Sequence, residues 1–354
     1  MIILELNFER NWRGGEQQTL YNAKGFISQG IEVHLICRKN SALEKKAIAE
    51  NIIVHAFKSI WGVFFFLIIS GKKFQVMHAQ GSKILTYCIL SKPFHKSKIL
   101  FTRRVNFVQS GILTKLKYRY TDKIIAISSS VKNIISTFTS RNDIVLISDI
   151  VIEKNLNSQV ATEKLKKLHL DNRIIIGTIA ALSIEKNPFG TIEAIKMLKE
   201  KRNDFVFLHF GEGVLMEKMK QLIEAYQLSD TYLLMGFEEN VTDYFSKIEI
   251  FVMNSNNEGL CSSVLDSFLY KVPVISTLAG GLSDLIKEDR GIICEMNNAK
   301  MLSEKMNFLL ENPLVAEKLV TNAYHYVTKN HGLDFITAQY VQLIDKMINN
   351  NTTN

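Results

Sequence analysis

Short runs of apolar and often β-branched residues alternate along this chain with longer segments of helical periodicity. In the first half, the apolar runs predict strands at Ile2–Leu6, Ile31–Cys37, Ile52–Ala56, Phe74–His78, Lys98–Thr102, Lys123–Ile127 and Asp143–Ile147. In the second half, they predict strands at Arg173–Ala180, Phe205–Phe210, Tyr232–Met235, Ile248–Met253, Val272–Ser276 and Gly291–Cys294. Helical patterns fill the intervals, and two of them, Pro313–Lys329 and Leu333–Ile348, follow the last strand. This alternation is typical of a doubly wound parallel sheet, so we predict an α/β fold.

The length of 354 residues predicts two domains, because each would be large enough to bury its own core. A charged stretch, Glu163 to Arg173, separates the two α/β patterns. We therefore place the first domain at residues 1–165 and the second at residues 166–334.

Charge divides along the same line. Residues 1–170 hold 26 Lys and Arg against 11 Asp and Glu, a net charge of +15, whereas residues 171–354 hold 17 against 24, a net charge of −7. A basic half joined to an acidic half indicates that the first half meets an anionic surface. Phosphorylated glycan and anionic lipid both fit. Nucleic acid is disfavoured, because this half lacks the interleaved aromatic residues of RNA-binding modules.

Other features are typical of a cytosolic protein. The four cysteines are scattered with no CxxC pair, which favours reduced thiols over disulfides or a zinc site. Glu5 and the lack of a basic region at the N-terminus predict a first strand, not a signal peptide. The longest apolar run, Ile60–Ile69, is about half the length that spans a bilayer. This run includes Phe64–Phe66 and precedes Lys72 and Lys73, so it either covers the sheet or contacts lipid at an interface.

Residues 254–281 combine the features of a ligand site. Glu258 follows the predicted strand Ile248–Met253, which places it at the carboxyl edge of a sheet, where open α/β sheets bind ligands. Ser262 or Ser263 is placed to cap the next helix, whose N-terminus would attract a phosphate, and Asp266 lies in the first turns of that helix.

An ordinary structural interpretation also fits these residues. Ser263 to Asp266 matches a capping box, and Gly280 with Gly281 matches a turn.

The order of these features resembles the nucleotide-sugar site of the retaining glycosyltransferases of family 4. Their signature is two glutamates separated by seven residues, and here Glu258 and Asp266 have that separation, with the second carboxylate on a shorter side chain. The resemblance covers most of residues 1–330 and implies the GT-B fold, in which two Rossmann-like domains face a central cleft. Because the last helix commonly crosses back in that fold, residues 335–354 are expected to pack on the first domain.

The resemblance implies a donor site in the second half. Glu258 would hold the donor sugar, Asp266 the ribose hydroxyls, and Lys186 the diphosphate. Backbone groups at four further positions would lie near the phosphates or the base: Gly259, Leu260, Gly211 and Gly213. Ala181 departs from the pattern, because many relatives have an arginine of the diphosphate clamp there.

In the first half, the resemblance implies that Gly14 and Gly15 let ligands approach the backbone, while Arg103 and Arg104 supply positive charge to the donor or acceptor. His78 would end a strand at the same cleft, and Glu258, Arg104 and His78 are the expected catalytic residues. Each also has an ordinary interpretation: a lone lysine such as Lys186 or a basic pair is commonly solvated, and a histidine at a strand end is often structural.

The expected activity is retaining transfer of a sugar from a nucleoside-diphosphate sugar to a glycan or glycolipid, in surface polysaccharide or lipopolysaccharide-type assembly at the cytosolic face of a membrane. No HxxxH cluster, DxD pair or P-loop is present, so neither a metal nor a cofactor is predicted. Hydrolysis is disfavoured, because eight residues along one helix separate two carboxylates by about 12 Å, against roughly 5–9.5 Å in glycosidases. Two alternatives remain: a non-catalytic partner subunit with the same fold, favoured by Ala181 and Arg104, and a sugar-nucleotide 2-epimerase.

Overall fold

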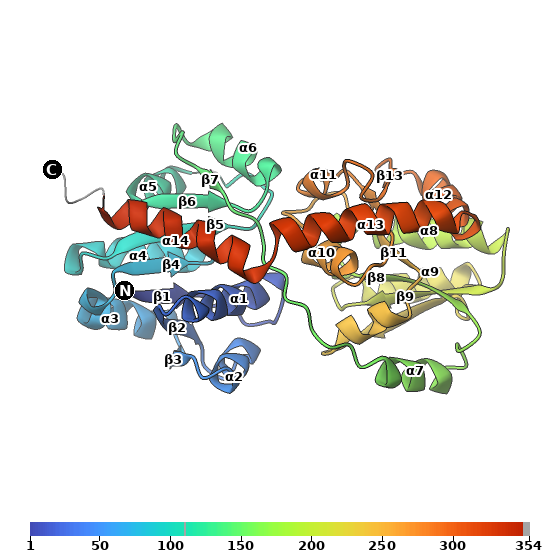
Figure 1. The fold of residues 1–354 in the computed structure, drawn as a ribbon, viewed down its shortest axis with the longest axis horizontal. Helices are drawn as coiled ribbons and strands as arrows, with labels where there is room; N and C mark the ends of the chain where they lie inside the picture. Colours follow the sequence, from blue (N-terminus) through green and yellow to red (C-terminus); the bar gives the residue numbers. More distant parts are fainter. Residues whose placement is uncertain (110, 350–354) are drawn as a thin grey trace. The chain divides into compact units, whose positions relative to one another are not determined.

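The computed structural model describes residues 1–109 and 111–349, which form two compact units (Figure 1). Unit 1 contains Met1–Ile152 and the chain from Asn330 onward, and unit 2 contains Glu153–Lys329. The sequence placed the boundary at 165/166 instead. The difference arises because an amphipathic helix, α7 (Ser158–Lys167), overlaps the start of the charged stretch. This helix buries Ala161 and Leu165 and packs on the 3-10 helix η4 (Val241–Ser246) of unit 2.

Unit 1 is built on a fully parallel sheet of seven strands in the order β3-β2-β1-β4-β5-β6-β7. The strands are β1 (Ile2–Leu6), β2 (Glu32–Arg38), β3 (Ile53–Phe57), β4 (Val76–Ala79), β5 (Lys98–Arg103), β6 (Lys123–Ala126) and β7 (Val145–Leu146).

Helices cover both faces of this sheet. On one face, α1 (Gly14–Ser28), α2 (Ala42–Ala49) and α14 (Leu333–Asn349) share a core with alternate strand residues such as Ile3, Val76 and Leu100. The remaining helices are α3 (Ile60–Ser70), α4 (Ser82–Ser91), α5 (Ile112–Tyr120) and α6 (Ser129–Phe138), with the 3-10 helices η1 (Gly71–Lys73) and η2 (Lys92–Phe94). Helix α4 packs on both α3 and α5, so these three helices form a continuous layer.

Unit 2 contains a six-stranded parallel sheet in the order β10-β9-β8-β11-β12-β13. Its strands are β8 (Ile174–Ile179), β9 (Phe205–Phe210), β10 (Tyr232–Gly236), β11 (Ile250–Met253), β12 (Val274–Thr277) and β13 (Ile292–Cys294). Its helices are α8 (Pro188–Lys199), α9 (Met216–Ala225), α10 (Ser262–Leu269), α11 (Leu282–Leu285), α12 (Ala299–Glu311) and α13 (Pro313–Asn330), with the 3-10 helix η3 (Ile184–Lys186).

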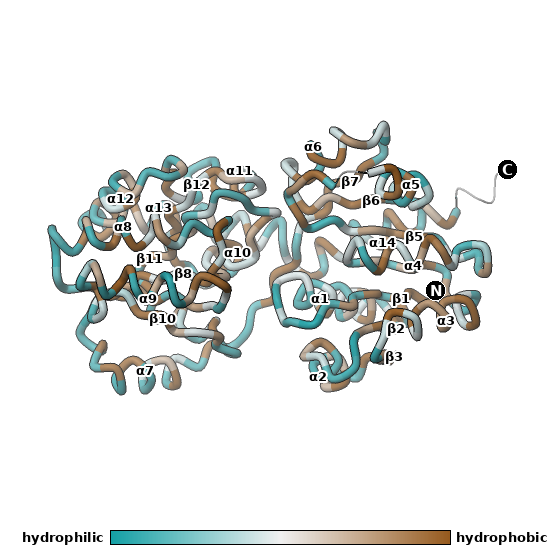
Figure 2. The backbone as a smooth tube through the Cα atoms, turned by 180° about the vertical axis from the view of Figure 1, so that it is seen from behind, coloured by the Kyte–Doolittle hydropathy of each residue, from teal (hydrophilic) through white to brown (hydrophobic). Residues whose placement is uncertain are grey.

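The predicted α/β architecture with two doubly wound parallel sheets is confirmed. Every predicted strand forms, and strand ends differ from the predicted ones by at most two residues. The two last predicted helices form as α13 and α14. Hydrophobic residues concentrate along the strands (Figure 2), because both faces of a parallel sheet are covered by helices. Among the described residues, no helix combines the length and the apolar character needed to cross a bilayer.

Candidate functional site

In unit 2, the order in which the chain adds strands to the sheet reverses between β8 and β11. The chain continues from β8 to β9 on one side and from β11 to β12 on the other. Loops that leave two adjacent parallel strands in opposite directions open a crevice at the carboxyl edge of the sheet. The residues that follow β8 include Lys186, and those that follow β11 include Glu258.

Lys186 and Glu258 form an ion pair at this point, through Nζ and Oε1. The hydroxyl of Ser255 donates a second hydrogen bond to the same carboxylate oxygen, at 2.8 Å. Only 7% of the Glu258 side chain is exposed, against 23% for Lys186. Burial alone would lower the pKa of Lys186, but Glu258 and further nearby groups such as Glu185 together outweigh burial and raise the pKa, so the lysine carries its charge.

Backbone contacts fix the two loops that carry this pair. The carbonyl oxygen of Glu185 accepts hydrogen bonds from the N–H groups of Asn256 (2.7 Å) and Asn257 (3.3 Å), and this joins the β8 loop to the β11 loop. The Gly281 N–H donates to the Glu258 carbonyl at 3.0 Å. A Cβ at Gly281 would lie 2.1 Å from the Gly259 carbonyl oxygen, so this close approach requires glycine.

Helix α10 begins differently from the prediction. Its N-cap is Cys261, with φ of 94°, and no side chain caps the helix. The predicted serine cap is therefore wrong, and so is the capping box, because Ser263 donates to the Ile179 carbonyl at 3.2 Å instead. Burial, reinforced by the nearby Glu258, raises the pKa of Cys261 to about 12, so this thiol stays neutral.

Asp266 is partly buried on α10, and burial raises its pKa to about 7, with Lys154 offsetting only part of the effect. Among the described residues, none donates a hydrogen bond to its carboxylate. A partly buried carboxylate without a donor is suited to accept hydrogen bonds from a ligand hydroxyl.

Gly211 and Gly213 form a turn that packs on the loop after β8. A Cβ at Gly211 would lie 2.1 Å from the Ala180 carbonyl oxygen, and one at Gly213 would lie 2.3 Å from the Leu182 carbonyl oxygen. The two loops are also joined by the Leu182 N–H, which donates to the Glu212 carbonyl at 3.1 Å. These glycines therefore have a structural role, whether or not a base lies beside them.

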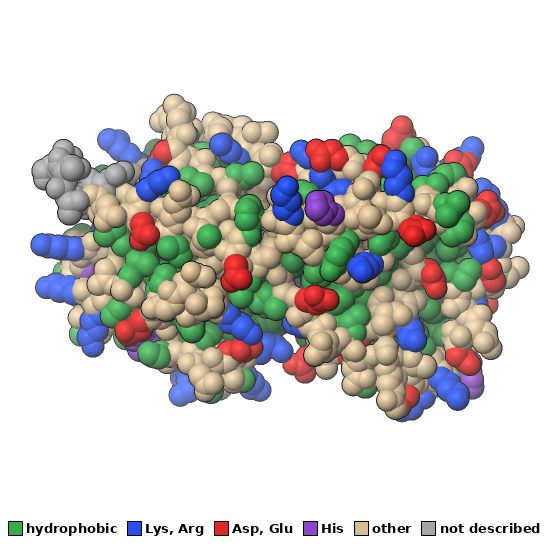
Figure 3. Space-filling view, in the orientation of Figure 1, with side chains coloured by type: hydrophobic (Ala, Val, Ile, Leu, Met, Phe, Trp, Pro, Cys, Tyr) green, Lys and Arg blue, Asp and Glu red, His purple; other side chains and the backbone are tan. Residues whose placement is uncertain are grey.

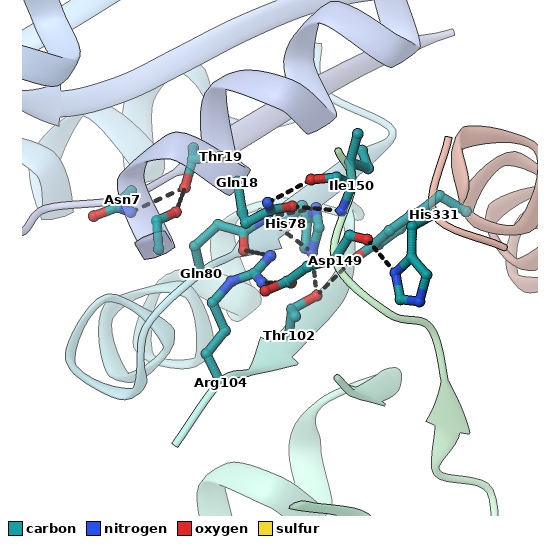
Figure 4. A network of polar contacts seen from close by, with 12 residues as sticks. Asn7, Gln18, Thr19, His78, Gln80, Thr102, Arg104, Asp149, Ile150 and His331 are labelled. Carbon is teal, nitrogen blue, oxygen red and sulfur yellow. Dashed lines mark hydrogen bonds and ion pairs between the residues drawn. The ribbon is translucent and has the colours of Figure 1, made fainter. Parts of the chain in front are cut away.

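In unit 1, the corresponding change of direction lies between β1 and β4. Glu5, His78 and Thr102 occupy the last inward positions of β1, β4 and β5 on the face covered by α14. The His78 ring lies 2.7 Å from Glu5 through Nδ1 and 2.7 Å from Thr102 through Nε2 (Figure 4). The His78 side chain is fully buried, so it lies inside the unit and not on an open surface as predicted.

Arg104 extends this polar network outward. Its guanidinium is paired with Asp149 and donates to Gln80 Oε1 at 3.3 Å (Figure 4). Burial alone would lower the pKa of Arg104, but Asp149, together with Tyr340 and Glu5, outweighs burial and raises the pKa. The side chain also borders α1, because a Cβ on Gly15 would lie 3.8 Å from Arg104 Cδ. Gly14 and Gly15 themselves form the first turn of α1.

Arg103 points into the protein. Its guanidinium donates to the Tyr118 hydroxyl at 2.6 Å and to the carbonyls of Val105 and Phe107, and 1% of the residue is exposed. The structure thus directs the two adjacent arginines to different environments.

The predicted residues fall into two sites that are each described within one unit. Lys186, Glu258, Gly259, Leu260 and the Gly211–Gly213 turn lie on loops at the carboxyl edge of the unit 2 sheet, with Asp266 on the helix that follows. Within the described ranges, no group of three or more His, Cys, Asp or Glu side chains is arranged to hold a metal ion.

Sequence reasoning missed Glu5, Asp149 and Ser255. Glu5 carries a detectable signal, because an acid at an inward position of a buried strand needs a partner. The pairing of Asp149 with Arg104 spans 45 residues and has no local signal.

Comparison with known proteins links unit 2 to a described family. Residues 160–326 match the family Glycosyl transferases group 1. The Anabaena protein HepE, in a crystal structure with UDP-glucose, is 15% identical with a TM-score of 0.87 over 98% of this chain and all of that chain. The fold is therefore the GT-B glycosyltransferase fold.

The curated relatives are longer than the part of them that this chain matches. A poly(ribitol-phosphate) alpha-N-acetylglucosaminyltransferase of Staphylococcus aureus is 20% identical over 93% of this chain and 66% of its own length. A Campylobacter jejuni N-acetylgalactosaminyltransferase, named for a diphospho-undecaprenol acceptor, is 27% identical over 43% of this chain and 41% of its own length. The chain spans 57 to 66% of the first curated relatives that it matches.

Proposed function

We propose that this protein is a retaining, metal-independent glycosyltransferase of family 4 that moves a sugar from a nucleoside-diphosphate sugar to a glycan or glycolipid acceptor. The observation that carries the proposal is the Lys186–Glu258 ion pair at the point where the unit 2 sheet changes direction. Both residues lie in the segment that matches the family. A cation and a carboxylate side by side suit a sugar attached to a diphosphate, which needs both.

In the free protein, Lys186 and Glu258 neutralise each other. In the proposed complex, the donor diphosphate attracts Lys186, and Glu258 accepts hydrogen bonds from the sugar hydroxyls. The N–H groups of Gly259 and Leu260 face the phosphates, and Asp266 accepts hydrogen bonds from the ribose. The contacts to the phosphates stabilise the charge that develops on the diphosphate as it leaves.

The acceptor attacks from the face that the leaving diphosphate vacates, and the donor phosphate takes the acceptor proton. No side-chain nucleophile is required in this mechanism. The neutral thiol of Cys261, the cysteine beside the ion pair, agrees with it.

The acceptor is proposed to be a phosphate-bearing glycan or a lipid-linked glycan in surface polysaccharide or lipopolysaccharide-type assembly. By their names, the S. aureus relative acts on poly(ribitol-phosphate) and the C. jejuni relative on a diphospho-undecaprenol. Both acceptors are anionic, as the net charge of +15 in residues 1–170 would favour. We place Gly14, Gly15 and Arg104 on the acceptor side, with His78 buried behind them in unit 1, and the protein at the inner face of the cell membrane in peripheral contact with anionic lipid.

Turnover with a panel of UDP-, GDP- and ADP-sugars tests the proposal. Glu258→Gln keeps the side-chain size but removes the charge, so we expect transfer to fall about 100-fold or more. Binding of the nucleoside diphosphate alone should be retained or tightened, because Lys186 is freed. Lys186→Ala should weaken both. Glu249→Gln is the matched control, since Glu249 is exposed just before β11, at the opposite end of that strand. A wild-type rate for Glu258→Gln would overturn the proposal.

A non-catalytic partner subunit is the second candidate. Ala181 removes a cation from the expected clamp, and Arg104 is already paired with Asp149. This candidate predicts that a nucleotide sugar raises the melting temperature while no donor in the panel is turned over.

A further inference from the structure

Helix α3 carries a row of large apolar side chains that face solvent. Trp61, Phe65 and Ile69 repeat every four residues, and 61%, 59% and 78% of them are exposed. The opposite side of the helix buries Val63 and Leu67 against the sheet. Packing on the sheet therefore buries only part of the apolar surface of α3. The row of Trp61, Phe65 and Ile69 stays exposed, as at surfaces that bind a partner or a membrane.

The exposed row continues across the neighbouring helices. Trp61 makes an edge-to-face contact with Tyr87 of α4, with ring centres 6.0 Å apart. On α5, 78% of Ile112 and 78% of Leu113 are exposed. Lys92 in η2 donates to the Tyr120 carbonyl at 2.9 Å, which joins the far ends of α4 and α5. We name this surface, formed by the exposed residues of α3, α4 and α5 and of the adjoining chain (residues 58–73, 82–96 and 112–120), the three-helix face.

The charge on this segment has one sign. Between Glu50 and Asp122 the chain contains no Asp or Glu but twelve Lys and Arg. Several of these cations are exposed and form no ion pair within the part of the chain that the structure describes: Lys58, Lys72, Lys73, Lys83, Lys96, Lys115 and Arg119. In Figure 3, Lys and Arg side chains project from the edge of unit 1 where α3 and α4 lie in Figure 1.

We infer that the three-helix face docks on an anionic bilayer, with Trp61, Phe65 and Ile69 inserted at the headgroup level. Apolar insertion and lysine attraction to anionic lipid act together, and each lysine near such a surface adds about 1 kcal/mol. Tryptophan is enriched at this depth in membranes, because its ring has both an apolar body and a polar N–H group.

A second copy of this chain fits the face less well. A two-fold dimer would place the face against itself, so the unpaired lysines of one copy would meet those of the other. Like charges at such an interface repel, whereas the phosphate groups of a bilayer neutralise them. The inference identifies the surface for the membrane contact contained in the proposed function. Its test uses neither donor nor acceptor, so failure of docking and failure of the enzymatic proposal are separable.

Flotation of the full chain with vesicles tests the docking. Binding should be strong on phosphatidylglycerol vesicles, weak on phosphatidylcholine vesicles, and reduced by salt. Replacing Trp61, Phe65 and Ile69 together by Ser should weaken binding on the order of tenfold or more, because inserted apolar area is lost. The matched apolar control replaces exposed residues of unit 2: Leu168, Phe308 and Leu314.

A charge series separates the two contributions. Lys72, Lys73 and Lys96 changed together to Gln should weaken binding and reduce its salt dependence, whereas the same change at Lys201, Lys218 and Lys300 of unit 2 should not. All variants are checked for unchanged melting temperature, which is expected because the replaced side chains are exposed.

Fluorescence gives an independent reading of depth. The chain has two tryptophans, so Trp12→Phe leaves Trp61 as the single emitter. Its emission should shift to the blue on phosphatidylglycerol vesicles and be quenched by brominated lipid. Equal binding by the Ser variant, unshifted Trp61 emission, or a concentration-dependent dimer that the Ser variant abolishes would overturn the inference.

Discussion

Adjacent arginines at the end of β5 have different functions in the fold. Arg103 faces α5 and is held by the Tyr118 hydroxyl, while Arg104 faces the other side and is held by Asp149. Successive side chains of a strand point to opposite faces of the sheet, so two neighbouring residues such as Arg103 and Arg104 lie in different environments. Arg104 is therefore the member of the pair that remains a candidate for ligand contact.

The Arg104–Asp149 pair gives a prediction about stability. Both side chains are mostly buried, at 12% and 8% exposed, so removing either leaves an uncompensated charge. Arg104→Met and Asp149→Asn should each lower the free energy of unfolding by about 3 kcal/mol. The double variant should lose clearly less than the sum, which denaturant unfolding measures as a coupling energy. Additive losses would show that the two charges do not stabilise each other.

Asp266 gives a prediction about pH. Burial raises its pKa to about 7, above the ordinary value of 3.8, so the folded protein holds this proton while the unfolded chain releases it. The contribution of Asp266 to stability is therefore complete below pH 3.8 and is lost as the pH rises to about 7. Relative to the wild type, Asp266→Asn should match it near pH 4 and become more stable at pH 8. Equal stability at both pH values would contradict the raised pKa.

The same carboxylate should control donor affinity. A ribose hydroxyl donates its proton best to an ionised carboxylate, so the affinity for a nucleotide sugar should rise about tenfold per pH unit up to about pH 7 and then level. A nucleotide sugar is the right ligand, because its diphosphate does not titrate in this range. Calorimetry on Asp266→Asn should give a flat profile. A pH-dependent profile in that variant would assign the effect to another group.

At the scale of elements, the loops around Glu258 are fixed by close backbone contacts. Gly281→Ala would place a Cβ 2.1 Å from the Gly259 carbonyl oxygen, so we expect the free energy of unfolding to fall by about 1–3 kcal/mol. Transfer activity should fall as well, because the displaced loop carries Glu258. Gly15→Ala is the control for stability, because its Cβ would have only ordinary contacts and α1 gains a better helix former. Hydrogen exchange should show increased opening of residues 255–262 in Gly281→Ala alone.

The strands could be predicted from the sequence, because buried parallel strands are short, apolar and rich in β-branched residues. Every strand from β1 to β13 was predicted for this reason. Helix α7 was missed, because its many lysines concealed the two residues that it buries, Ala161 and Leu165. Composition marks such a stretch as a linker, whereas packing on η4 makes it part of unit 2.

The candidate site could be predicted from the sequence only in part. Glu258 and Lys186 follow strands, and the carboxyl edge of a parallel sheet places such residues together. Which partners they take is decided by residues far apart in sequence, such as Glu258 with Lys186 at a separation of 72 residues. Likewise, the burial of His78 depends on Tyr340 of α14, whose ring centre lies 5.4 Å away. No local pattern contains this information.

At the scale of the whole molecule, unit 1 is discontinuous in sequence. Helix α14 follows unit 2 along the chain but packs on α1, where it buries Ile336, Tyr340 and Ile344 in the unit 1 core. The folding of unit 1 therefore requires residues that are synthesised after unit 2. Unit 2, from Glu153 to Lys329, contains its own core.

This arrangement predicts that a substitution in α14 acts on one unit. Ile344 is fully buried, so Ile344→Ala should cost about 2–5 kcal/mol by leaving a cavity in the unit 1 core. Hydrogen exchange should lose protection in β1, β4 and α1, while β8 and β9 keep theirs, because their core contains no residue of α14. Gln342→Ala is the matched control, since this residue is exposed on the same helix. Equal loss of protection in both units would show that they unfold as one cooperative body, and the two cores would then not be independent.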